Sequence, residues 1–322
     1  MRRLLTILAT LLLVTQTLCA QRLSWPESVK GERVRSSLDK SGQMVMFHAT
    51  SSDEPRPLIV VMHGWGGAYK TITPLVKFII DKDWNFIQPN LHGPSSSPLS
   101  CGSATAMTDI ADAIEFALTH GNVDMGEIHI VGVLNGGHNA LAAYMTIDYP
   151  IKSVSAWAGV SDLEAWYRQI HKAKAYKYIS FCDDMLTATG SREDDLNLKE
   201  FARRSPLKMK LPKCRKRTKL LLYSGNSDGK RNGGPVPPSQ SVDMFNLVTA
   251  AFDKKNAVLI SEDELTEAVN GMNVSLSDET IGEREILLHK ENKYAEMTIF
   301  RGGHEIFYDE LFNRIPVNEK YR

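Results

Sequence analysis

Two polar residues in the second half of the chain, Asp228 and His304, have the types and the setting that acid–base chemistry needs. Asp228 follows the apolar run 218–225, and His304 lies in a glycine loop just after the apolar run 295–300. A histidine held by a buried carboxylate can take a proton from a nucleophile, because the carboxylate fixes the tautomer and stabilises the imidazolium. As alternatives, Asp228 could be an ordinary turn residue and His304 an ordinary loop histidine.

The nucleophile that such a pair would serve belongs to a glycine-rich turn earlier in the chain. A β-branched run, 128–133, passes through Leu134 into two glycines and then into a helix-like segment that ends near residue 145. Glycines two residues either side of a central position mark a strained strand–turn–helix connection that presents the central side chain to substrate. That side chain is Leu134, which is no nucleophile. Since loss of a serine nucleophile costs about six orders of magnitude in turnover, we expect very little serine-type chemistry here.

The sequence offers no other residue that could be the nucleophile at the tip of this turn. Moving the turn by one position would put Asn135, which is not a nucleophile, at the tip and Val133 where a small residue is required. Cys101 and the serines at positions 103, 161 and 227 belong to other segments of the chain.

A second glycine-rich loop, His-Gly-Trp-Gly-Gly at 63–67, follows the continuous apolar run 57–62. A loop of this kind supplies a backbone N–H group to an oxyanion hole. We therefore expect the N–H groups of Trp65 and Asn135 to be the oxyanion donors, with His63 and Tyr69 contacting the substrate. The alternative is a glycine-rich strand end with no role.

The elements that must position these residues alternate along the chain. Strand-like apolar runs alternate with helix-like segments joined by short loops, which predicts a parallel sheet covered by helices on both faces. Residues from about 161 to 212 interrupt this alternation with helix-like, aromatic and charged sequence, and we expect them to form a cap. The expected strands are 34–37, 44–48, 57–62, 84–90, 128–133, 153–160, 218–225, 285–289 and 295–300, and the expected helices are 75–80, 103–118, 138–145 and 238–252.

Taken together, these motifs resemble the α/β-hydrolase superfamily in its prolyl-oligopeptidase-like (peptidase S9-like) branch. The resemblance runs from about Val34 to the end of the chain and depends on 63–67, 132–138, 158–162, Asp228 and 302–305. It implies an α/β-hydrolase fold, which has a mostly parallel central sheet with helices on both faces, with a small helical cap insertion at about 161–212. It also implies serine-type hydrolysis through an acyl-enzyme, without the propeller of the large peptidases. The departure from the pattern is Leu134.

Three functions remain open at this point. The first is a pseudoenzyme that keeps the pocket and binds an acyl, peptide or glycan ligand. The second is an active serine hydrolase, either a peptidase or a carbohydrate or acyl esterase, that uses Asp228 and His304. The third is a structural or partner-binding module.

The start of the chain reads as a secretory signal peptide, with a basic beginning, an apolar stretch and a plausible cleavage site after Ala20. We expect residues 1–20 to be this signal peptide and 21–322 to be one hydrolase domain, exported to the periplasm or secreted. No later run is apolar for long enough to predict stable membrane insertion.

Composition excludes some partners and cofactors. Lysine plus arginine and aspartate plus glutamate both number 38, so we expect no nucleic-acid partner. Three cysteines follow the signal peptide, and Cys182 and Cys214 could form a disulfide or stay free with Cys101. The spacing of cysteine and histidine predicts no zinc site, and we expect no metal or other cofactor.

Overall fold

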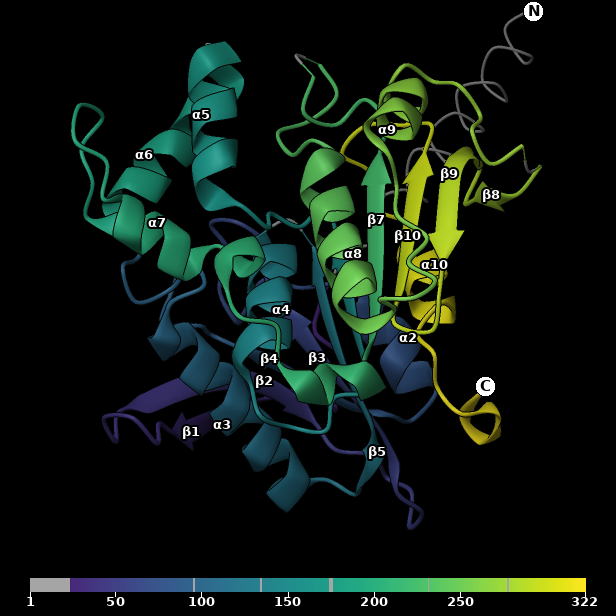
Figure 1. Cartoon of the computed structure of the whole chain (residues 1–322). Helices are drawn as coiled ribbons and strands as arrows, with labels where there is room; N and C mark the ends of the chain where they lie inside the picture. The colour runs from purple at the N-terminus through teal and green to yellow at the C-terminus, as the bar shows by residue number, and fades with distance from the viewer. Residues whose placement is uncertain (1–23, 95, 134, 174–175, 231, 277) are drawn as a thin grey trace, which may run out of the picture.

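The computed structural model describes residues 24–94, 96–133, 135–173, 176–230, 232–276 and 278–322 (Figure 1). The expected signal peptide at 1–20 and the turn residue Leu134 therefore lie outside the described residues.

A ten-stranded sheet, in the order β1-β2-β4-β3-β5-β6-β7-β10-β9-β8, organises the chain. The six strands from β4 to β10 in that order are parallel neighbours, and the flanking strands pair antiparallel. The expected α/β-hydrolase fold with its mostly parallel sheet is confirmed. The strands are β1 (Lys30–Arg35), β2 (Gly42–His48), β3 (Arg56–Met62), β4 (Asn85–Pro89), β5 (Val123–Val133), β6 (Ser153–Trp157), β7 (Lys219–Gly225), β8 (Thr280–Ile281), β9 (Arg284–Glu291) and β10 (Ala295–Phe300).

The continuous apolar runs are strands because both faces of the sheet are covered. On β3, Leu58 and Val60 point into a core formed with helices α3 (Ala104–His120), α4 (Asn135–Thr146) and α8 (Ser239–Phe252). The alternate residues Ile59 and Val61 point into a second core on the opposite face, shared with α2 (Leu75–Asp81) and α10 (Tyr308–Asn313). Side chains that alternate between two cores explain why the sequence shows no polar face on this strand.

The segment between β6 and β7 forms three grouped helices, α5 (Leu163–Ala173), α6 (Ile179–Thr189) and α7 (Leu198–Arg204), with 3₁₀ turns η1 (Tyr176–Tyr178), η2 (Pro206–Lys208) and η3 (Lys213–Arg217). Figure 1 shows α5, α6 and α7 together above α4, at the end of the molecule toward which the arrows of β7 and β10 point. These helices and the turn η1, which we call the cap, share their own apolar cluster, built around Trp166, Tyr167 and Phe201.

The structure differs from the sequence expectations in some details. Strand β6 ends at Trp157 rather than at residue 160, because Ala158 has a φ of 47° that breaks the extended backbone. Helices α9 (Glu262–Val269) and α10 and the turn η4 (Glu319–Tyr321) were not predicted. All three described cysteines are free, so Cys182 and Cys214 form no disulfide here. Within the described ranges, the structure contains no helix with the length and apolar character of a membrane span.

Candidate active site

The glycine-rich turn joins β5 to α4 in the middle of the sheet, where β5 lies between β3 and β6. A Cβ atom on Gly132 would lie 1.9 Å from the carbonyl oxygen of Gly136, and one on Gly136 would lie 2.4 Å from that of Met62. One on Gly137 would lie 2.8 Å from the Cα of Gly159. Backbone approaches this close exclude any side chain, so all three glycines are required by the turn. Leu134 connects β5 to α4 in sequence and lies outside the described residues.

Asp228 and His304 are brought together by the adjacent parallel strands β7 and β10, whose carboxyl ends carry them. His304 Nδ1 donates to Asp228 Oδ2 at 2.5 Å. Asp228 Oδ1 accepts from the N–H groups of Gly229 and Val236, both at 2.9 Å. The carboxylate accepts all three hydrogen bonds, so the histidine proton belongs on Nδ1 and Nε2 is left as the acceptor. The arrangement is that of a carboxylate–histidine pair ready to take a proton.

Nothing among the described residues uses the free nitrogen of this pair. The side chain of Asp228 is completely buried and that of His304 is 17% exposed. His304 Nε2 is itself buried and has no hydrogen-bond partner within the part of the chain that the structure describes. A buried polar atom without a partner is uncommon and points to a ligand, a water molecule or a catalytic role.

The two loops that carry Asp228 and His304 pack closely against each other. The backbone N–H of His304 donates to the carbonyl oxygen of Gly233 at 2.7 Å. Gly234 has a φ of 144°, and a Cβ atom there would lie 2.3 Å from Asp228 Oδ1 and 2.5 Å from His304 Cβ. The glycines after Asp228 therefore allow the acid loop (228–230 and 232–235) to touch the histidine loop (302–305).

His304 opens onto a hollow of about 550 Å³, which we call the histidine pocket. The acid loop lines it from Asn232 to Pro235, and the histidine loop from Gly303 to Glu305. The cap contributes Tyr178 and Phe181, whose rings stack at 6.0 Å and 11°. The pocket can thus present an aromatic surface to a ligand beside the free histidine nitrogen.

Trp65 in the second glycine-rich loop reaches the cap. Its indole Nε1 donates to Asp184 Oδ2 on α6 at 2.6 Å, and its ring meets Trp166 and Phe181 at 5.2 and 5.3 Å. Trp166 Nε1 in turn donates to the carbonyl oxygen of Pro235 at 2.7 Å. These contacts therefore connect the 63–67 loop, the cap and the acid loop. Sequence reasoning missed Asp184 because nothing in the spacing of α6 sets it apart.

His63 and Tyr69, expected at the substrate, lie in different places. His63 is 3% exposed, and its two ring nitrogens lie 3.2 and 3.1 Å from the carbonyl oxygens of Gly64 and Asn90. Burial lowers the pKa of His63. Tyr69 is half-buried against the α2 and α10 core and is not among the residues that line the histidine pocket. His63 lines a separate, smaller hollow of about 200 Å³.

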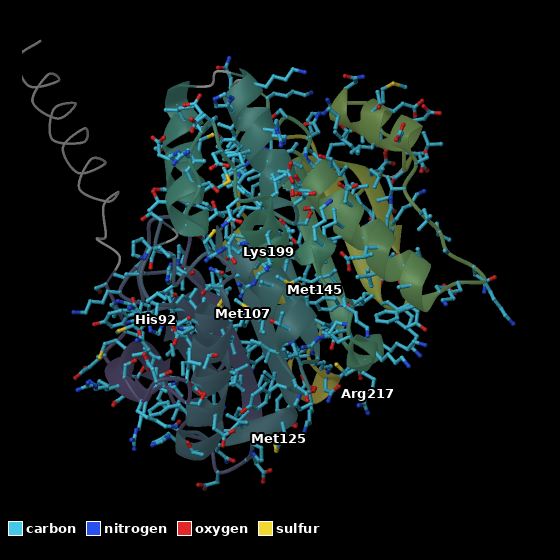
Figure 2. The ribbon with its side chains drawn as sticks, turned by 60° about the vertical axis from the view of Figure 1, so that its left-hand side comes forward. His92, Met107, Met125, Met145, Lys199 and Arg217 are labelled. Atoms are coloured by element: carbon cyan, nitrogen blue, oxygen red, sulfur yellow. The ribbon has the colours of Figure 1, made fainter. Side chains whose placement is uncertain are left out.

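The other histidines near the strand ends are packed. His138 Nδ1 donates to the carbonyl oxygen of Val160 at 2.8 Å, and burial lowers its pKa to about 4. His92, labelled in Figure 2 beside α3, has Nδ1 2.5 Å from Asp109 Oδ2, and its Nε2 accepts from Gln43 at 2.9 Å. This second histidine–aspartate pair differs from the first because no ring nitrogen is left free. The described residues contain no group of three or more His, Cys, Asp or Glu side chains that could hold a metal ion.

Comparison with known proteins gives the fold. No protein-family model matches the chain, and no curated protein sequence matches it. Among solved structures, it is similar to acylaminoacyl peptidase of Pyrococcus horikoshii (TM-score 0.52, 20% identity, 74% of this chain and 37% of that one). It is also similar to a mutant puromycin hydrolase complexed with PGG (TM-score 0.52, 16% identity, 92% and 39%) and to a puromycin-hydrolyzing peptidase of Mycobacterium tuberculosis (TM-score 0.50, 19% identity, 67% and 32%).

The chain spans about a third of the length of these peptidases. At 16 to 20% identity the similarity shows a shared α/β-hydrolase fold, and it says nothing about the activity of this chain.

Proposed function

We propose that this chain is a non-hydrolysing relative of serine peptidases and esterases, which uses the histidine pocket to bind an acyl, peptide or glycan ligand. The proposal depends on one contrast. The Asp228–His304 pair has the geometry of a working acid–base pair, while the sequence places Leu134 at the position that would supply the nucleophile. Without a hydroxyl or thiol there, no acyl-enzyme can form through this position.

Two further observations support ligand binding. The histidine pocket remains open beside His304, and its aromatic wall comes from the cap. One similar structure, the mutant puromycin hydrolase, is described as complexed with PGG. We include export in the proposal because residues 1–20 have the sequence of a signal peptide.

The test is restoration of the nucleophile. Purified unmodified protein and Leu134→Ser are treated with a fluorophosphonate, and mass spectrometry locates the modified residue. We expect labelling only in Leu134→Ser, at position 134, and loss of that labelling when His304→Ala is added. Unmodified protein is then titrated with short peptides, acyl esters and oligosaccharides, and we expect one of these classes to bind and remain intact.

A second candidate function is an active hydrolase in which another group replaces the serine. The Nε2 atom of His304, which has no partner in the part of the chain that the structure describes, favours it, because a free base can also activate a different nucleophile. Fluorophosphonate labelling of the unmodified protein at another residue, abolished by His304→Ala, would establish this function and overturn the first.

A further inference from the structure

A second hollow lies beside Gly132 and Val133 at the end of β5 and differs in chemistry from the histidine pocket. It has a volume of about 200 Å³ and touches His63 and Gly64 of the glycine-rich loop, Val133 just before Leu134, and Ile306 just after His304. We call it the Gln88 pocket. Its remaining walls come from β3, β4, β5, the loop residues 71–73 and the helices α2 and α10.

The walls of the Gln88 pocket are uncharged. Among the described residues, no lysine, arginine, aspartate or glutamate lines it, and the branched side chains of Val61, Leu75, Val131 and Leu311 form much of its surface. A charged group would lose its hydration in this hollow without gaining a partner of opposite charge. The surroundings therefore select a neutral, mainly apolar group.

Gln88, which lines the pocket, has one side-chain polar atom with no hydrogen-bond partner among the described residues. Gln88 on β4 is fully buried, and its Nε2 donates to the carbonyl oxygens of Tyr69 and Thr71, both at 2.8 Å. These two bonds fix the amide so that Oε1 is the free end. Oε1 is buried and accepts no hydrogen bond from any described residue. Leaving a buried amide oxygen unpaired costs about 1–3 kcal/mol, so the site gains free energy from any donor placed there.

We propose that the Gln88 pocket is a binding site for a compact, neutral, mainly apolar group carrying one hydrogen-bond donor, an N–H or O–H that bonds to Gln88 Oε1. Its volume is somewhat larger than the ~150 Å³ of an apolar cavity that holds benzene, so a single or fused aromatic ring fits. A single water molecule, whose share of liquid volume is about 30 Å³, would satisfy Oε1 but leave the apolar walls uncovered. Tyr308, whose pKa is raised by burial, stays neutral at the edge of this space.

This inference does not depend on the proposed function, since neither His304 nor position 134 takes part in the binding event. Failure of the Leu134→Ser experiment leaves it standing, and its own failure leaves the histidine pocket unaffected.

The test uses two probes of nearly equal shape, indole and benzofuran, which differ in having a ring N–H or a ring oxygen. Binding to the full-length protein is measured by isothermal titration calorimetry, and a crystal soaked with indole locates the ring. We expect indole in the Gln88 pocket with its N–H on Gln88 Oε1, and affinity about tenfold above that of benzofuran, as one hydrogen bond predicts.

Two variants test the hydrogen bond to Gln88 and the volume of the pocket separately. Gln88→Met keeps the side-chain volume and removes the acceptor, so indole and benzofuran should bind it equally. Ile306→Phe fills the hollow and should weaken both probes at least tenfold. Ile80→Phe is the matched control, because Ile80 is also half-buried against the same core but does not line the pocket, and both affinities should stay unchanged.

Three results would overturn the proposal. These are equal affinities of the unmodified protein for the two probes, unchanged binding by Ile306→Phe, and an indole ring located elsewhere with only ordered water on Gln88 Oε1. The Ile306→Phe arm keeps the test decisive if Gln88→Met fails to fold.

Discussion

Trp65 and Asp184 are joined by a 2.6 Å hydrogen bond from the indole Nε1 to a carboxylate oxygen, although they are 119 positions apart in the chain. Trp65 belongs to the loop expected to carry an oxyanion donor, and Asp184 belongs to cap helix α6. The position of that loop therefore depends on the cap, and the cap depends on the loop.

Removing this bond should loosen the cap. Hydrogen bonds to charged groups contribute roughly 1.5–3 kcal/mol when well shielded, and Asp184 is half-buried, so we expect Asp184→Ala to lower the free energy of unfolding by about 1–2 kcal/mol. Urea denaturation followed by tryptophan fluorescence measures this change. Asp183→Ala is the control, because Asp183 is next to Asp184 in the chain and its side chain is exposed. Equal effects of the two substitutions would show that the bond contributes nothing.

Gly234 should be essential to the acid–base pair. A Cβ atom there would collide with both Asp228 Oδ1 and His304 Cβ, so Gly234→Ala must push the two side chains apart. A short Nδ1–H···Oδ2 bond gives a strongly deshielded proton resonance, which we expect in the unmodified protein and not in Gly234→Ala. Gly31→Ala is the control, because a Cβ atom there comes no closer than 3.8 Å to its neighbours. Persistence of the resonance in Gly234→Ala would contradict the packing described.

Acid should destabilise the fold partly through His138. Its pKa is lowered to about 4 by burial, against about 6.5 in an unfolded chain, so the unfolded state binds more protons between these values. Its contribution to stability is complete above pH 6.5 and is lost as the pH falls toward 4. We expect this to account for up to about 3 kcal/mol.

Unfolding free energies of the unmodified protein and His138→Gln between pH 4.5 and 7.5 measure this contribution. The variant should lose less stability over that range, whereas the surface substitution His120→Gln should leave the profile unchanged. Identical profiles for the unmodified protein and His138→Gln would rule out His138 as a source of acid sensitivity.

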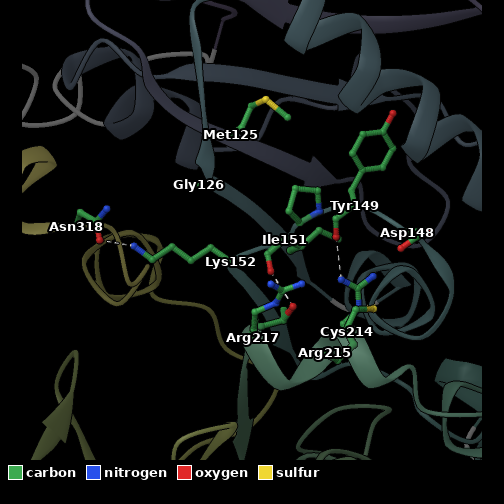
Figure 3. A pocket seen from close by; sticks show the side chains of 12 residues that line it. Met125, Gly126, Asp148, Tyr149, Ile151, Lys152, Cys214, Arg215, Arg217 and Asn318 are labelled. Atoms are coloured by element: carbon green, nitrogen blue, oxygen red, sulfur yellow. Dashed lines mark hydrogen bonds between the residues drawn. The ribbon is translucent and has the colours of Figure 1, made fainter.

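Arg215 should be the important member of the basic run 213–217. It is 1% exposed, and its guanidinium donates to the carbonyl oxygens of Tyr144, Ile147 and Tyr149 at the end of α4. Figure 3 shows the bond to Tyr149. Arg215→Met would leave these carbonyls unpaired in a buried place, and we expect a loss of about 3 kcal/mol in the free energy of unfolding. Arg217→Met, at an exposed position two residues away, should change it by less than about 0.5 kcal/mol. Thermal denaturation of both variants measures the two losses of stability. If Arg215→Met lost as little stability as Arg217→Met, the contacts to the carbonyl oxygens would be unimportant.

The parts of this molecule that sequence could predict are those with local signals. Strands such as β3 and β7 are long apolar runs, and a histidine and an aspartate that follow parallel strands must approach one edge of the sheet. Glycine spacing indicated the turn at Gly132 because the backbone contact there permits no side chain.

What sequence could not predict depends on contacts between distant segments. Asp184 looks like any polar residue on a helix, and only the folded chain places it on Trp65. In the sequence, Arg215 is one of several lysines and arginines between 208 and 219 with nothing to set it apart, yet it is buried against the end of α4. Gln88 shows its unpaired oxygen only after Tyr69 and Thr71 have taken its two N–H groups.

The turn and the Asp228–His304 pair are carried by different strands, and this has a consequence for how such a protein can evolve. Position 134 follows β5, whereas Asp228 and His304 follow β7 and β10, and the described hydrogen bonds to the Asp228 carboxylate come from Gly229, Val236 and His304. Leucine and serine codons can differ by a single base. Under the proposed function, one substitution at position 134 would therefore separate a binding protein from a hydrolase, because the hydrogen bond between Asp228 and His304 is already in place.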